Sequence, residues 1–214
     1  METEQLAQTY AFLATGSLYL ALLVSPLYSA FPQLAYKGLA TKARRALGVS
    51  SFVFALFHVY LTFFVQLGGF AGLPFLDSTY IWAICLSSLA LLILTLMAAT
   101  SSDWAIRKLS FPRWKWLHRL VYLAGILIII HALLLGSDFG GESGSLAGQV
   151  ALFLLSILLM LEALRIDTYL ARIAPRLPRL GLVSLIVLAI ILLAPHYINL
   201  GGLSIHAHHA DAVK

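Results

Sequence analysis

Six long runs of apolar residues dominate the chain, and each is long enough to cross a lipid bilayer. A spanning helix needs about 20 mostly apolar residues to cross roughly 30 Å of hydrocarbon. Helices satisfy their backbone hydrogen bonds internally, which is required where no water is present. The sequence therefore predicts an all-α integral membrane bundle of six transmembrane helices, at residues 10–31, 49–70, 80–99, 116–136, 146–164 and 180–200.

The composition agrees with a membrane protein and excludes several other classes. Hydrophobic residues make up 61% of the chain and charged residues 11%, which is about half the charged share of a soluble domain. These values exclude a soluble domain, a disordered chain and a nucleic-acid partner. The single cysteine, Cys85, cannot form an internal disulfide bond.

The basic residues alternate between the loops that connect the six runs. All but one of the fourteen Lys and Arg residues lie in or beside the first, third and fifth loops. The charged residues of the second and fourth loops are all acidic. The positive-inside rule therefore predicts that the basic loops are cytoplasmic, with both termini on the outer side. The basic positions are Lys37, Lys42, Arg44, Arg45, Arg107, Lys108, Arg113, Lys115, Arg119, Arg165, Arg172, Arg176 and Arg179.

Two histidines lie inside predicted spans that run in the same direction. His58 follows Arg45 by 13 residues and His131 follows Lys115 by 16 residues, which are about 20 Å and about 24 Å of helix. The two imidazoles are therefore expected at similar depth. Two such ligands suit both axial positions of a b-type haem, an arrangement that favours electron transfer over oxygen binding. The alternative is two buried polar side chains bonded to the backbone or to each other.

His118 is expected about 20 Å nearer the cytoplasm than His131, at a depth that suits a second redox site. On an ideal helix the side chains of His118 and His131 point about 140° apart. They can share one cleft only if the helix is tilted or distorted. Gly125 is a candidate position for such a distortion. Arg44 lies 14 residues before His58 on nearly the same face, but it cannot ligate iron. This argues against a second bis-His haem, and an interfacial His118 that bonds lipid headgroups is the alternative.

Several other polar and aromatic residues have two interpretations each. Arg44, Arg45 and Arg119 anchor the cytoplasmic boundary, or they bind a haem propionate, a quinone or a flavin phosphate. The four tryptophans lie at span ends, where an aromatic belt is typical: Trp82, Trp104, Trp114 and Trp116. Glu162 and Arg165 are expected to pair.

The C-terminal part of the chain contains further histidines. His196 lies beside Pro195 near the end of the sixth run, where it is either an interfacial residue or a third ligand. Residues 1–204 are predicted to form the six-helix haem domain, and residues 205–214 to form an external tail. This tail is either solvated or a weak transition-metal site, because it contains His206, His208 and His209.

The sequence resembles the ferric reductase-like transmembrane domain family over roughly residues 40–136. Within that family it is most similar to the haem-binding membrane subunits of bacterial methionine sulfoxide reductase systems. The resemblance rests on Arg44-Arg45-Ala-Leu-Gly48, Phe57-His58, Arg107-Lys108-Leu109, Arg113-Trp114-Lys-Trp-Leu-His118-Arg-Leu-Val-Tyr122, and His131. The spacings of 60 residues between His58 and His118 and of 13 residues between His118 and His131 also match.

The resemblance implies a six-helix b-type cytochrome of the bacterial inner membrane. It would take electrons from a quinol or a flavin such as FMN at the cytoplasmic side, and pass them to a soluble external partner such as a methionine sulfoxide reductase. His58 and His131 would be the haem ligands, and His118 a residue of a lower site or of a second haem.

The sequence thus predicts the electron-transfer subunit of an oxidoreductase system. Electrons would enter near His118, Arg44 and Arg119, reach the haem at His58 and His131, and leave on the outer side. Two alternatives remain open. One is an accessory haem-binding subunit of a larger membrane complex, and the other is a haem-dependent metal or quinone reductase.

Overall fold

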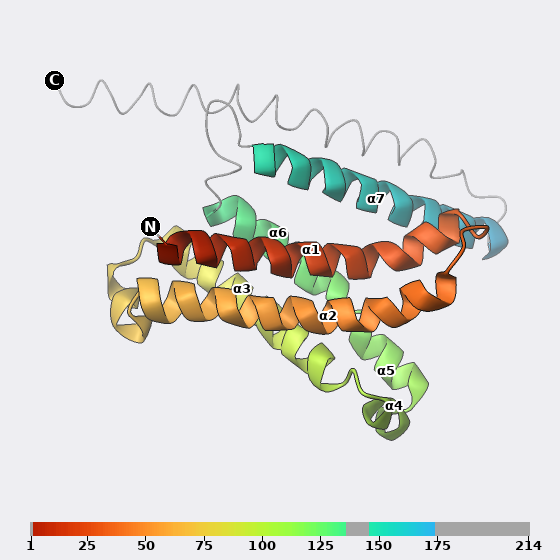
Figure 1. Cartoon of the computed structure of the whole chain (residues 1–214), viewed down its shortest axis with the longest axis horizontal. Helices are drawn as coiled ribbons and strands as arrows, with labels where there is room; N and C mark the ends of the chain where they lie inside the picture. The colour runs from red at the N-terminus through yellow and green to blue at the C-terminus, as the bar shows by residue number, and fades with distance from the viewer. Residues whose placement is uncertain (1, 136–145, 174–214) are drawn as a thin grey trace. The chain divides into compact units, whose positions relative to one another are not determined.

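The computed structural model describes residues 2–135 and 146–173. Every regular element in these ranges is a helix, which confirms the predicted all-α class (Figure 1). The chain divides into one unit of residues 1–24 and 36–135, and another of residues 25–35 and 136–214. The first unit contains all the predicted haem and donor-side residues.

The helices follow the order of the predicted apolar runs. In chain order they are α1 (Glu2–Ala30), α2 (Lys37–Val59), the π-helix η1 (Tyr60–Gln66), the 3-10 helix η2 (Gly69–Phe75), α3 (Ser78–Ala99), α4 (Asp103–Leu109), α5 (Phe111–His118), α6 (Val121–Leu135) and α7 (Leu146–Ile173).

Four segments of the described chain are long and apolar enough to span a membrane: Glu2–Ala30, Lys37–Gln66, Ser78–Ala99 and Phe111–Leu135. They correspond to the first four predicted spans. Helix α7 covers the fifth predicted run. The sixth run at residues 180–200, with His196, and the tail at residues 205–214 lie outside the described residues.

Two helix boundaries differ from the sequence prediction. Helix α2 begins at Lys37, twelve residues before the predicted start at residue 49, because the Ala-, Lys-, Arg- and Leu-rich segment ahead of the apolar run favours helix. Hydropathy detects only the apolar part of such a helix. Helix α1 begins at Glu2, eight residues before the predicted start at residue 10, and continues through Pro26 to Ala30.

Small residues and polar cross-links pack the helices of the first unit. Helix α3 lies against α6, and α2 lies against α3. Ala83 and Ala90 on α3 and Ala124 on α6 are fully buried, and such small side chains let helix backbones approach closely in membranes. Helices α1 and α2 run side by side (Figure 1), and buried Ser51 donates a hydrogen bond of 2.8 Å to the Ala14 carbonyl oxygen.

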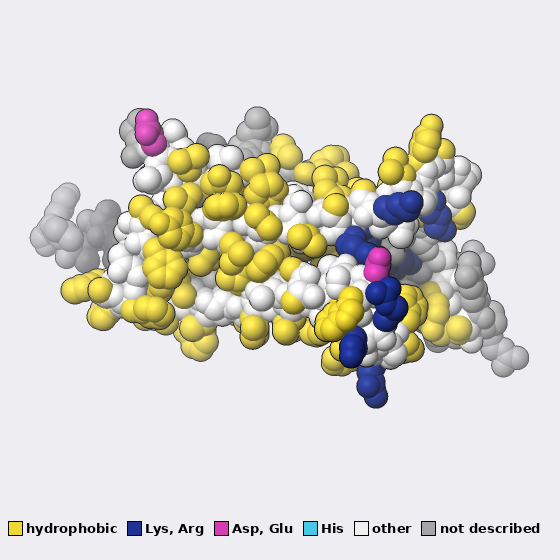
Figure 2. Space-filling view, turned by 60° about the horizontal axis from the view of Figure 1, so that its bottom comes forward, with side chains coloured by type: hydrophobic (Ala, Val, Ile, Leu, Met, Phe, Trp, Pro, Cys, Tyr) yellow, Lys and Arg dark blue, Asp and Glu magenta, His cyan; other side chains and the backbone are white. Residues whose placement is uncertain are grey.

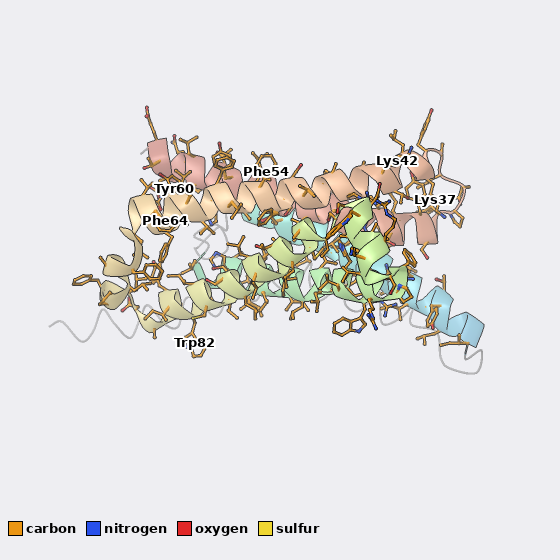
Figure 3. The ribbon with its side chains drawn as sticks, turned by 90° about the horizontal axis from the view of Figure 1, so that it is seen from below. Lys37, Lys42, Phe54, Tyr60, Phe64 and Trp82 are labelled. Atoms are coloured by element: carbon orange, nitrogen blue, oxygen red, sulfur yellow. The ribbon has the colours of Figure 1, made fainter. Side chains whose placement is uncertain are left out.

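The surface of the first unit separates apolar from charged side chains. Figure 2 shows hydrophobic side chains over most of one face, with Lys and Arg gathered toward one end. Lys37 and Lys42 lie at one end of the long segment formed by α2 and η1, and Tyr60 and Phe64 lie at the opposite end (Figure 3). Four apolar helices with large exposed hydrophobic side chains identify an integral membrane protein.

The second unit contributes the end of α1 and helix α7. Glu162 and Arg165 form an ion pair of 2.8 Å within α7, which confirms the predicted pairing. In the segment at residues 25–35, the Tyr28 hydroxyl donates a hydrogen bond of 2.7 Å to the Ala35 carbonyl oxygen.

Candidate functional site

His58 lies near the end of α2 and is fixed by the backbone of α1. Its Nδ1 atom lies 2.9 Å from the carbonyl oxygen of Ala7. A carbonyl oxygen only accepts hydrogen bonds, so Nδ1 carries the proton and donates. In this tautomer the lone pair lies on Nε2, the nitrogen that can then bind a metal.

The helix changes from α to π geometry two residues after His58, where η1 begins at Tyr60. Single π turns inside helices are frequent at functional sites. Thr62 of η1 donates a hydrogen bond of 2.9 Å to the His58 carbonyl oxygen. The backbone around His58 therefore remains bonded through the change in helix type.

His131 on α6 has the same arrangement as His58. Its Nδ1 atom lies 3.0 Å from the carbonyl oxygen of Ala83 on α3. Ala83 is 0% exposed, so this hydrogen bond lies where the two helices touch. As in His58, Nδ1 donates and Nε2 keeps its lone pair.

The two histidines both lie in the first unit. Their imidazoles lie within electrostatic range of each other, although one ring is held by α1 and the other by α3. The described residues contain no cluster of three or more His, Cys, Asp or Glu side chains able to hold a metal ion. A haem needs only two protein ligands, because the porphyrin supplies the other four. By donor type, two imidazole nitrogens are the protein ligands that a bis-His haem would require.

His118 is the last residue of α5 and has different partners. Its Nε2 atom lies 3.3 Å from the Thr100 hydroxyl oxygen. The centroid of the Trp114 indole ring lies 4.2 Å from that of the His118 imidazole. The indole Nε1 of Trp114 donates a hydrogen bond of 2.9 Å to the Thr100 carbonyl oxygen. In His118 the engaged nitrogen is thus Nε2, not Nδ1.

The chain breaks its helix directly after His118. Helix α5 ends there and α6 begins at Val121, so the 140° rotation expected for one ideal helix does not apply to His118 and His131. The interruption lies at residues 119–120, whereas α6 runs from Val121 through Gly125 to Leu135. The polar residues before the break belong to a separate short helix.

The arginines of the first basic loop lie close to His118. Both Arg44 and Arg45 lie within electrostatic range of its ring. Arg44 is half-buried, and among the described residues no carboxylate forms an ion pair with it. Arg119, the third predicted arginine, is exposed beside the break between α5 and α6. A half-buried guanidinium of this kind can bind an oxyanion.

Arg45 already has an acidic partner. Its guanidinium donates a hydrogen bond of 2.6 Å to Asp103 at the start of α4. This hydrogen bond, together with the positive charges of Arg45 and Arg107, holds the pKa of the Asp103 carboxyl below its ordinary value. Figure 2 shows one acidic side chain among the basic ones at this end.

Sequence reasoning missed the partners that orient the three histidines. The carbonyl groups of Ala7 and Ala83 carry no side-chain pattern, so nothing in the sequence marks them. Trp114 was predicted to belong to an aromatic belt, and Thr100 was not singled out. The spacing of four residues from Trp114 to His118 would have placed them on one helix face.

Named relatives align with about half of this chain. The protein-methionine-sulfoxide reductase heme-binding subunit MsrQ of Agrobacterium fabrum is 41% identical over 123 residues, which are 55% of this chain and 52% of the relative. MsrQ of Salmonella paratyphi B is 39% identical over 116 residues, covering 52% and 54%. MsrQ of Ralstonia nicotianae is 33% identical over 90 residues, covering 42% of each. The aligned part thus spans about half the length of these relatives.

No solved structure matches this chain. A sequence model of one family does match, over residues 10–129. This segment includes His58 and His118 and ends two residues before His131, so it covers most of the first unit. The match extends over more than half of the chain and confirms the predicted family. The chain belongs to the family described as ferric reductase like transmembrane component.

Proposed function

We propose that this protein is a membrane b-type cytochrome that passes electrons from a donor at its basic end to an acceptor protein at its opposite end. The observation that carries the proposal is the matched pair of imidazoles, each bonded through Nδ1 to a backbone carbonyl and each without a hydrogen bond at Nε2 to any described residue. A haem held by these two residues would supply one-electron iron chemistry.

His58 and His131 are the proposed haem ligands. The carbonyl groups of Ala7 and Ala83 hold the two rings in one tautomer and prevent rotation about χ2. Hydrogen bonds of this kind make a ligating imidazole more basic and fix its orientation. Because the partners are backbone groups of neighbouring helices, the two ligands keep their geometry as long as the helices stay packed.

The donor side is proposed at the basic end of the first unit. Arg44, Arg119 and His118 offer positive charge and ring nitrogens to an anionic or hydroxylated donor, for which a quinol and a flavin are the two candidate classes. The excess of basic residues supports a cytoplasmic location for this end, and therefore termini on the outer side of a bacterial inner membrane.

The acceptor class is proposed from the relatives. Those proteins are named as the heme-binding subunit of a protein-methionine-sulfoxide reductase, so we propose a reductase of this kind as the external partner. Repair of one methionine sulfoxide consumes two electrons and two protons and releases water. The same names also favour a second candidate, an accessory haem-binding subunit of a larger complex, while the family description favours a metal reductase.

A reconstituted system tests the proposal. The purified protein is placed in liposomes, reduced with a quinol, and mixed with a protein-methionine-sulfoxide reductase and a methionine sulfoxide substrate. The proposal predicts that the reduced haem absorbance decays only when both acceptor and substrate are present. Decay with ferric citrate but not with the reductase would support the metal reductase instead. A haem that the quinol does not reduce would support the accessory subunit.

A further inference from the structure

The segment that joins η1 to α3 is apolar, although it lies between two spans. From Leu67 to Leu76 no side chain is charged or able to form a hydrogen bond. A connection that lies in water ordinarily consists of polar and turn-forming residues. This segment, which contains η2, therefore has the composition of a surface that an apolar environment covers.

The 3-10 helix η2 is folded back against the end of η1. Gly68 and Gly69 have φ angles of 73° and 71°, which glycine adopts without strain, and they turn the chain directly after η1. The rings of Phe63 on η1 and Phe70 on η2 are in edge contact, with centroids 5.1 Å apart. Gly72 lies so close to the Leu67 carbonyl oxygen that a Cβ atom would collide with it. The segment is therefore held close to the ends of the spans.

The other side of η2 is left uncovered by the described chain. Phe75 is 88% exposed, and Phe70 is 76% exposed in spite of its contact with Phe63. Pro74 between them is exposed as well. Large apolar side chains exposed together on one short element indicate a surface that contacts something outside the chain.

Counting along two helices places η2 at a boundary of the membrane. About 20 helical residues cross the hydrocarbon layer. Counted forward from Arg45 on α2, they end near Val65, and counted back from Thr100 after α3, they end near Tyr80. Because η2 lies between these two positions in the chain, it is expected at the level where the hydrocarbon meets the headgroups.

Aromatic side chains around η2 indicate the same level. Tyr60, Phe64 and Trp82 are exposed at the end of the first unit opposite Lys37 and Lys42 (Figure 3). Tyr and Trp are enriched where a membrane meets water. The exposed rings of η1 and α3 therefore form one continuous apolar surface with those of η2.

We infer that η2 is an interfacial anchor that inserts the side chains of Phe70, Pro74 and Phe75 between the phospholipids of the leaflet opposite the basic residues. The occupant is lipid, because the uncovered side of η2 continues the lipid-facing surface of the spans and offers no polar side chain to orient a partner protein. At this shallow depth the unpaired backbone groups of the segment still reach water, which the hydrocarbon core would not allow.

Nitroxide labels on single cysteines test the inference in liposomes of phosphatidylcholine and phosphatidylglycerol. Cys85→Ala removes the only natural cysteine, and Phe70→Cys or Phe75→Cys then supplies the labelling site. Power-saturation EPR compares collisions of the label with oxygen, which concentrates in lipid, and with a water-soluble nickel chelate. The inference predicts that collisions with oxygen exceed those with the chelate severalfold at both positions.

Two reference positions calibrate the depth. Leu92→Cys reports lipid, because Leu92 is exposed in the middle of the apolar helix α3, and Lys37→Cys reports water at the start of α2. Ratios of oxygen to chelate at positions 70 and 75 are expected between these references. Ratios equal to that of Lys37→Cys would overturn the inference. A chelate that is excluded only after a protein-methionine-sulfoxide reductase is added would also overturn it, in favour of a protein-docking surface.

A second measurement keeps an aromatic ring at the tested position. Phe75→Trp is placed in liposomes whose acyl chains are brominated near the headgroup or near the terminal methyl, and its fluorescence is measured as the difference from wild type. Stronger quenching by the bromine near the headgroup is expected, with the reverse order for Leu92→Trp. No quenching by either lipid, or stronger quenching by the terminal bromine, would overturn the inference. Neither measurement requires haem, so the result is independent of the proposed function.

Discussion

The Nδ1 atom of His131 lies 3.0 Å from the carbonyl oxygen of Ala83, at a point where α3 and α6 are in contact and Ala83 is completely buried. A side chain larger than alanine at this position separates the two helices and lengthens the hydrogen bond. The structure therefore makes the size of residue 83 a determinant of how His131 is held.

Ala83→Leu is predicted to raise the midpoint potential of the bound haem. Loss of the Nδ1 hydrogen bond makes the imidazole less basic, which destabilises the ferric state relative to the ferrous state. Overpacking is also expected to cost about 1–3 kcal/mol of stability. Spectroelectrochemical titration measures the potential.

Ala90→Leu is the control for that experiment. Ala90 is as buried as Ala83 and lies seven residues further along the same face of α3. Among the described residues, no histidine forms a hydrogen bond with Ala90. Ala90→Leu should destabilise the protein without a matching change in potential. Equal potential shifts in both variants would contradict a role for the Ala83 carbonyl.

Ser51→Ala is predicted to loosen the packing of α1 on α2. The buried hydroxyl donates to the Ala14 carbonyl oxygen across the two helices, and such a bond contributes about 1 kcal/mol. Denaturation in mixed micelles gives the free energy of unfolding. Ser87→Ala, which removes a bond within one helix, should have the smaller effect, and the reverse order would argue against the cross-link.

The Arg45–Asp103 ion pair is predicted to make stability depend on acid pH. The pKa of Asp103 is lowered in the folded protein by the Arg45 hydrogen bond and charge. The carboxylate therefore stabilises the folded state above the unfolded pKa of about 3.9, and this contribution is lost as the pH falls through the folded-state pKa.

Asp103→Asn tests this dependence through the thermal unfolding midpoint in detergent. The variant should unfold at a lower temperature than wild type near neutral pH, by a small margin because the pair is exposed. The difference should vanish in strong acid. A constant difference at all pH values would show that the ionised carboxylate is not the cause.

Gly72→Ala is predicted to destabilise the segment that follows the π-helix. A Cβ atom at Gly72 would collide with the carbonyl oxygen of Leu67. The backbone must shift to relieve this collision, which is expected to cost about 1–3 kcal/mol of stability. Gly48→Ala in α2 meets nothing and should stabilise the helix by about 1 kcal/mol. Thermal unfolding compares the two variants, and equal effects would contradict the collision.

Hydropathy and charge were sufficient to predict the helical class and the first four spans, because apolar length is a property of the sequence alone. Matched depths on parallel spans led to the expectation that His58 and His131 lie near each other. Hydropathy could not predict the start of α2 at Lys37 or the break after His118. Those boundaries depend on helix propensity and on how α5 packs against the end of α3.

The carbonyl partners of the histidines could not be predicted for a different reason. They depend on which backbone atom of one helix lies opposite a side chain of another, and that register is set by packing. Ala7 and Ala83 reveal their role only once α1 lies beside α2 and α3 beside α6. The same holds for Thr100, whose hydroxyl otherwise resembles any helical threonine that bonds its own backbone.

The central claim is that one haem is held by His58 and His131, and reduced-minus-oxidised absorbance spectroscopy with haem quantitation tests it most directly. The account predicts a low-spin b-type spectrum from the wild-type protein, and its loss in both His58→Ala and His131→Ala but not in His206→Ala. A wild-type protein without haem despite ample porphyrin supply, or an unchanged spectrum in either ligand variant, would contradict it.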